Sequence, residues 1–63
     1  MRQKLIEARQ AVGLTQKELG ALVKVSDKTI SHLEHGRSNG RVTLWDRLEH
    51  VLKTPQRELR KLS

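Results

Sequence analysis

The sequence contains no cysteine, a single proline and a single aromatic residue, Trp45. Without cysteine, neither a disulfide nor a cysteine-based zinc site can stabilise the chain. One aromatic side chain argues against a surface that stacks unpaired bases, as many single-strand and RNA binders do. No apolar run approaches the ~18 residues that span a bilayer, and the charged N-terminus lacks the apolar segment of a secretory signal. We therefore expect a soluble, cytoplasmic protein.

Positive charge is what the sequence has in excess. Thirteen Lys and Arg residues stand against seven Asp and Glu, which gives a net charge of +6. Such an excess indicates a polyanionic partner, and nucleic acid is the usual one. An acidic membrane surface is a competing interpretation, but it requires an amphipathic helix with bulky apolar residues opposite lysines. The last segment, QRELRKL, is too short and too weakly apolar for that role.

Apolar residues recur at helical spacing along all 63 residues, which predicts one all-α domain. Five short helices are expected, at residues 3–12, 16–23, 27–35, 44–53 and 56–62. Thr15 and Glu18 have the spacing of a capping box at the start of the second helix. Ser26 is placed to cap the third, and Thr54 with Pro55 is a typical start for the fifth.

The second and third predicted helices are joined by a three-residue turn, KVS, which is typical of a helix-turn-helix. The second helix is expected to turn Leu19, Leu22 and Val23 inward. The third, within SDKTISHLEHG, has Ile30 and Leu33 as its strong apolar anchors and is otherwise polar. An α-helix fits the major groove of DNA, where each base pair displays a distinct pattern of donors and acceptors. A narrow apolar back and a polar front suit a helix that reads DNA.

The stretch GLTQKELGALVKVSDKTISHLEHG resembles the lambda-repressor-like helix-turn-helix family of phage repressors, Cro proteins and bacterial relatives. The matching elements are the Gly-Leu-Thr-Gln start at 13–16, Glu18-Leu19, Gly20, the Ser26 cap, Thr29-Ile30-Ser31, Leu33-Glu34 and Gly36. The later segment, VTLWDRLEHVL with the following Pro and Glu-Leu, resembles the family's last two helices more loosely. The resemblance implies a compact five-helix domain that binds double-stranded DNA sequence-specifically. It also implies a transcriptional regulator, more often a repressor, that binds a palindromic operator as a homodimer.

Two residues depart from the family's pattern. Lys24 stands where glycine is usual and where φ is often positive, which costs any other residue about 1 kcal/mol. Gly20 stands where alanine is commoner. Glycine keeps the two helices close but weakens the second helix by about 1 kcal/mol. Both departures predict limited stability rather than a different fold.

The resemblance also implies which residues contact DNA. Base contacts are expected from the polar front of the third helix, at Asp27, Lys28, Thr29 and His32. For Asp27 the alternative is that it favours the positive end of its own helix. Phosphate contacts are expected at Gln16, Ser26, Arg37, Asn39 and Arg41. For all of these positions the alternative is a solvated surface without a partner.

Two further sets of residues are assigned by the resemblance to structural roles. Arg9 and Glu34 occupy positions that the family commonly joins by a partly buried ion pair, which would tie the first helix to the third. Trp45 is expected either in the core or, with Leu59 and Leu62, in a dimer contact made by the last two helices.

Metal binding and catalysis are not expected. His32 and His35 lack a third ligand nearby, and His50 lies in another predicted helix. No nucleophile has a supporting histidine and acid, so neither an enzyme nor a cofactor is predicted. The alternative function is a protein-interaction module of the same fold, such as an antitoxin-like or phage regulatory protein. A partner-binding face should be apolar and aromatic, whereas the front of the third helix is polar.

Overall fold

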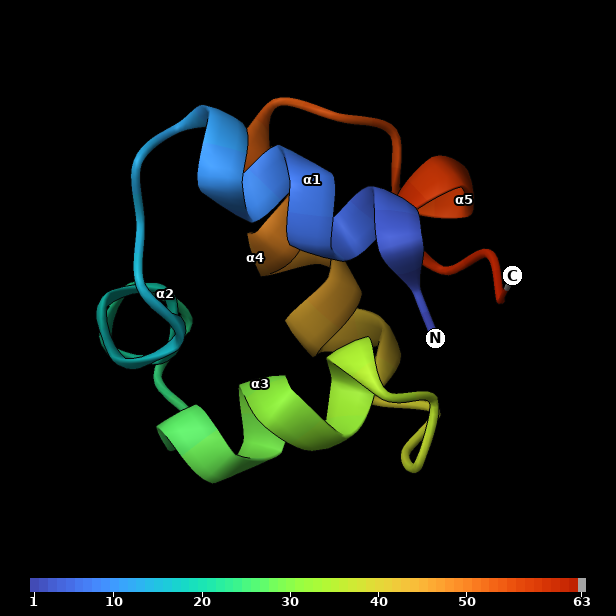
Figure 1. Ribbon diagram of the computed structural model, residues 1–63, viewed down its shortest axis with the longest axis horizontal. Helices are drawn as coiled ribbons and strands as arrows, with labels where there is room; N and C mark the ends of the chain where they lie inside the picture. Colours follow the sequence, from blue (N-terminus) through green and yellow to red (C-terminus); the bar gives the residue numbers. More distant parts are fainter. Residues whose placement is uncertain (63) are drawn as a thin grey trace.

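A computed structural model describes residues 1–62, and within them the secondary structure is entirely helical. The helices are α1 (Gln3–Ala11), α2 (Gln16–Val23), α3 (Asp27–Glu34), α4 (Val42–Leu52) and α5 (Gln56–Leu59). In Figure 1, α1 crosses the upper part of the molecule and α3 the lower part, with α4 behind and between them. α2, seen end-on at the left, connects the two, and α5 packs against α1 and α4. The predicted all-α, five-helix fold class is confirmed.

Five helix bounds differ from those predicted, three of them by one residue, since α1, α3 and α4 end at Ala11, Glu34 and Leu52. α4 begins at Val42, two residues early, because Arg41 already has the extended backbone of an N-cap. Val42 is apolar but 67% exposed, so it does not belong to the buried stripe from which the start of this helix was predicted. α5 ends at Leu59, because Leu59 is buried and anchors the helix, whereas Leu62 is 62% exposed and would stabilise no further turn.

The core draws side chains from all five helices. Its ten buried apolar residues are Leu5, Leu19, Val23, Ile30, Leu33, Leu44, Trp45, Leu48, Leu52 and Leu59. Burial of one such leucine or isoleucine contributes about 1.5–3 kcal/mol, a large share of the few kcal/mol that stabilise a domain of this size. The expectation that Leu22 faces inward is wrong. Leu22 is 56% exposed, because it lies about 100° around the helix from Val23, which takes the inward position.

The caps predicted for α2 and α3 are present. At the start of α2, the Glu18 backbone N–H donates to Thr15 Oγ1 over 3.1 Å, and the Thr15 N–H donates to Glu18 Oε1 over 2.9 Å. At the start of α3, the Thr29 N–H donates to Ser26 Oγ over 3.2 Å. These bonds satisfy backbone donors that a helix leaves unpaired at its first turn. They therefore set where both helices of the helix-turn-helix begin.

The turn between α2 and α3 explains both departures from the family's pattern. Lys24 ends α2 in the left-handed conformation, with φ 63° and ψ 42°. The chain then doubles back onto α2, so that a Cβ atom placed on Gly20 would lie 2.6 Å from the Val25 carbonyl oxygen. A real Cβ does not approach an oxygen so closely, and position 20 therefore requires glycine in this turn. Lys24 adopts the backbone that glycine would adopt at lower cost.

Arg2 is a buried cation that joins several parts of the chain. Its side chain is 3% exposed, and its Nη1 donates to the carbonyl oxygens of Leu33 and Ser38, each over 2.7 Å. Its Nε donates to the Arg60 carbonyl oxygen over 3.1 Å. Its backbone N–H donates to the Glu34 carbonyl oxygen over 2.7 Å. The last turn of α3 is therefore bound to the N-terminus of the chain.

Candidate nucleic-acid interface

The outward side of α3 is polar, as predicted. Ile30 and Leu33 are buried against the core, while Asp27 and Lys28 are exposed. Thr29 and His32 are partly exposed. With about 100° per residue, Lys28 and His32 lie one above the other on the side opposite the apolar anchors. Their side chains form neither an ion pair nor a hydrogen bond within residues 1–62, so their donors are available to a ligand.

Asp27 and Thr29 are placed differently from Lys28 and His32. Asp27 is in the first turn of α3, where a carboxylate favours the positive end of the helix. The Thr29 hydroxyl lies 3.1 Å from the Ser26 hydroxyl, and the Ser26 oxygen also caps the helix. Ser26 and Thr29 therefore share one small hydrogen-bond network at the start of α3.

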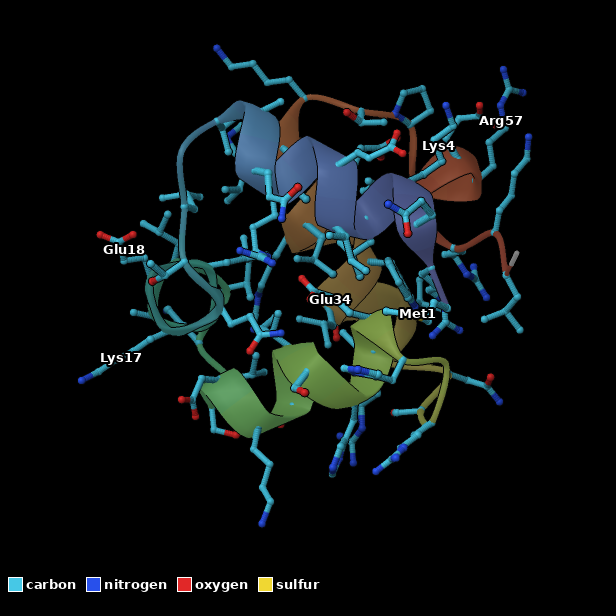
Figure 2. All side chains as sticks on the ribbon, viewed as in Figure 1. Met1, Lys4, Lys17, Glu18, Glu34 and Arg57 are labelled. Atoms are coloured by element: carbon cyan, nitrogen blue, oxygen red, sulfur yellow. The ribbon has the colours of Figure 1, made fainter. Side chains whose placement is uncertain are left out.

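Glu34 is the hub that fixes α3 to α1 and α2. Arg9 Nε donates to Glu34 Oε2 over 2.6 Å, and Arg9 Nη1 donates to the Leu14 carbonyl oxygen over 2.9 Å. Gln16 Nε2 donates to Glu34 Oε1 over 2.8 Å. Figure 2 shows Glu34 in the middle of the molecule, between α1 and α3. The carboxylate is 2% exposed, and these donors offset the cost of burying its charge.

The contact between Arg9 and Glu34 has the geometry that the sequence led us to expect. Gln16 was not expected in this contact. Its side-chain amide donates to the same Glu34 carboxylate rather than extending into solvent. Gln16 nevertheless begins α2 and is partly exposed, so its backbone amide and its remaining amide proton lie at the end of a helix that favours anions.

The loop from Arg37 to Arg41 combines a fixed backbone with exposed side chains. The Asn39 carbonyl oxygen accepts the Trp45 indole N–H over 2.7 Å, and the Gly40 N–H donates to Ser38 Oγ over 3.3 Å. Arg37, Asn39 and Arg41 are all exposed. The loop backbone is therefore fixed beside α3, while the side chains of Arg37 and Arg41 remain exposed to solvent.

Gly40 lets this loop close on the core. It has a φ of 70°, and a Cβ atom there would lie 2.8 Å from Trp45 Nε1 and 3.0 Å from a methyl carbon of Leu33. The backbone of the loop therefore lies directly on the buried tryptophan. The position of the exposed arginines follows from this contact.

The structure corrects the interface expected at Trp45 and Leu59. Both residues are fully buried inside this one chain, and the Trp45 N–H is already bound to the loop. The polar partner that a buried tryptophan requires is thus a backbone carbonyl six residues earlier. Leu62 has the exposure that a contact with another chain needs.

The histidines are not gathered around a common point. One ring nitrogen of His35, Nδ1, lies 2.8 Å from the Ser31 carbonyl oxygen. Across residues 1–62, no group of three or more His, Asp or Glu side chains is placed to hold a metal ion. In the same part of the chain, none of the helices is long and apolar enough to cross a membrane.

The chain was compared with family models, curated proteins and solved structures. Residues 5–59 match the model of a family described as helix-turn-helix. Neither the curated proteins nor the solved structures gave a match. The matched residues cover most of the chain and contain the α2–α3 pair, its caps and the Arg9–Glu34 bond. The chain therefore belongs to the lambda-repressor-like helix-turn-helix family and is a DNA-binding regulator.

Proposed function

We propose that this protein is a cytoplasmic transcriptional repressor that binds a palindromic DNA operator as a homodimer. α3 enters the major groove, and its outward side chains contact base edges. The observation that carries this proposal is the unpartnered polar side of α3, centred on Lys28 and His32. A helix that had to bury this side would leave charged and polar groups without partners.

Each base-facing residue has a chemically suitable partner in the groove. Lys28 donates to guanine O6 or N7, and His32 donates to a purine N7. Thr29 meets a base edge or a thymine methyl group at the side of the helix. Asp27 serves either cytosine N4 or the start of its own helix. Lys28, Thr29 and His32 therefore carry most of the sequence readout.

Phosphate contacts hold α3 in register on the DNA. They are assigned to the start of α2, the start of α3 and the following loop, at Gln16, Ser26, Arg37, Asn39 and Arg41. Such contacts set affinity and orientation and carry no base information themselves. The fixed loop backbone supports this assignment, because it holds Arg37 and Arg41 beside the recognition helix.

Dimerisation is proposed because one recognition helix contacts only a few base pairs. Two such helices about 34 Å apart reach successive turns of the major groove and read a palindromic site. Leu62 is the proposed dimer contact, because it is exposed and apolar and lies against Gly36 at the end of α3. Repression needs no contact beyond DNA, since a bound domain blocks access to the site.

The test is selection of bound duplexes from a random pool, carried out with the wild type and with Lys28→Ala and His32→Ala. We expect the wild type to enrich a palindrome and each variant to lose preference at particular positions. Lys4→Ala is the matched control, because Lys4 is exposed and lies near α5 at the opposite side from α3 (Figure 2). Enrichment of no sequence by the wild type would contradict specific readout.

The dimer is tested separately by sedimentation, with and without the enriched duplex. We expect two wild-type chains to bind one palindrome. Leu62→Asp should bind it more weakly, so that a higher protein concentration is needed to form the complex. Binding of one chain per palindrome would contradict the proposed assembly.

A further inference from the structure

A hollow of about 470 Å³ lies between α3, the loop that follows it and α4. Its polar lining comes from all three segments: Thr29, Ser38, Arg41, Thr43 and Arg47. Arg47 belongs to α4, and no local sequence pattern distinguishes it from the other polar residues of this amphipathic helix. The hollow is a concave surface beside the proposed recognition helix.

The lining of the hollow is suited to an oxyanion. It contains two guanidinium groups and three hydroxyl groups, and none of its residues is a carboxylate. Within residues 1–62, the ion pairs join Arg9 to Glu34 and Lys61 to Glu58, so neither Arg41 nor Arg47 is neutralised. Arg47 Nη1 makes one long bond of 3.4 Å to the Val23 carbonyl oxygen. Most of its planar set of donors remains available, and that set matches phosphate geometry.

The hollow also lies where a DNA strand would pass. At about 100° per residue, Glu34 and Thr29 lie on opposite flanks of the arc that carries Lys28 and His32. The Glu34 flank faces Gln16 and α2, whereas the Thr29 flank faces the hollow. A helix in the major groove has one sugar–phosphate backbone on each side. Gln16 thus stands beside one strand, and the hollow opens toward the other.

We propose that this hollow receives a backbone phosphate of the second DNA strand, and that Arg47 is one of its ligands together with Arg41. The proposal rests on the proposed function, since it requires α3 to lie in the groove. It adds α4 to the DNA-binding surface and gives each flank of α3 its own phosphate contact. The ligand is the phosphodiester itself, so the contact contributes affinity rather than sequence preference.

The experiment compares Arg47→Gln with Arg57→Gln on the duplex enriched by the wild type. Both variants lose one positive charge, but Arg57 lies on α5 at the opposite side of the molecule from α3 (Figure 2). We expect Arg47→Gln to bind about tenfold more weakly and to lower the slope of log K against log salt by about 0.9 per subunit. It should enrich the same sequence. Arg57→Gln should keep the wild-type slope.

A second variant tests the hollow without removing Arg47. Thr43→Glu places a carboxylate at the hollow, in the first turn of α4, where acidic residues are favoured. We expect it to fold like the wild type, by circular dichroism, and to bind the duplex at least tenfold more weakly. Gln10→Glu, at an exposed position on α1, is its control and should bind within about twofold of the wild type.

The outcomes separate this proposal from the function on which it rests. If the wild type binds no duplex, the proposed function fails and the phosphate site fails with it. If the wild type binds but Arg47→Gln matches Arg57→Gln in affinity and salt slope, the phosphate site alone is overturned. A changed enriched sequence with an unchanged slope would also overturn it, because Arg47 would then contact a base.

Discussion

The guanidinium carbon of Arg2 lies 5.2 Å from the centroid of the Trp45 ring. The same guanidinium binds the carbonyl oxygens of Leu33 and Ser38, so one cation covers the tryptophan and closes the last turn of α3. Burial, together with the charge of Arg60, lowers the pKa of Arg2 from its usual value. Arginine remains protonated in proteins, and carbonyl groups at the end of a helix favour such a cation.

Arg2→Met should destabilise the protein by about 2–4 kcal/mol, because it leaves buried carbonyl groups without donors and removes the contact with Trp45. Urea denaturation followed by circular dichroism measures the change. Lys4→Met is the control: Lys4 is exposed on α1, so its loss should change the free energy of unfolding by less than about 0.5 kcal/mol. Equal effects of the two substitutions would contradict the role assigned to Arg2.

Arg9→Ala and Glu34→Ala should each destabilise by about 2–4 kcal/mol, because each leaves a buried charge without its partner. The double variant should lose less than the sum of the two single losses. A double-mutant cycle from denaturation curves measures this coupling. Simple additivity of the three values would argue against a direct bond.

Gly20→Ala should destabilise by about 1–3 kcal/mol, since the new Cβ atom meets the Val25 carbonyl oxygen. Helix propensity alone predicts the opposite, a gain of about 1 kcal/mol. Ala21→Gly, at the next and exposed position of α2, is the control and should cost about 1 kcal/mol. A stabilised Gly20→Ala variant would show that α2 and the turn are not so closely packed.

Lys24→Gly should stabilise the protein by about 1 kcal/mol, because Lys24 has a positive φ that glycine adopts freely. Lys53, with φ 53° after α4, should respond in the same way. Lys4→Gly, within α1, should instead destabilise by up to about 1 kcal/mol. Thermal unfolding of the three variants measures the differences, and a destabilised Lys24→Gly would mean that the lysine side chain itself stabilises the turn.

Binding of the enriched duplex should depend steeply on salt. If each subunit makes about four phosphate contacts, log K should fall with log salt at a slope near −7 for the dimer. Fluorescence anisotropy of a labelled duplex at several salt concentrations measures this slope. A complex that is insensitive to salt would be inconsistent with phosphate contacts at the start of α2 and in the loop.

Local features of the fold could be predicted because they depend on residues three or four apart. The α2 bounds and the Thr15–Glu18 box agree with the structure for this reason. Helix ends without such a signal could not be placed. Val42 begins α4 although it is exposed, and Leu62 lies outside α5 although it is apolar. In the structure, the extended backbone of Arg41 sets the start of α4, and the buried Leu59 is the last residue of α5.

The sequence by itself determined the five-helix pattern, the caps of α2 and α3, and the polar front of α3, since side-chain period and short-range hydrogen bonds specify them. The predicted Thr54 cap of α5 is absent: Pro55 is the N-cap, and the Thr54 hydroxyl donates to the Leu52 carbonyl oxygen. The tertiary structure decided the roles of Arg2, Trp45 and Arg47. Arg2 and Leu33 are 31 positions apart, so no local pattern indicates their hydrogen bond. Trp45 can be buried in the core because the Asn39 carbonyl oxygen of the loop accepts a hydrogen bond from its indole N–H. The hollow forms where α3, the loop and α4 lie side by side. The tertiary packing of these segments brings them together, and the spacing of residues along the sequence does not indicate it.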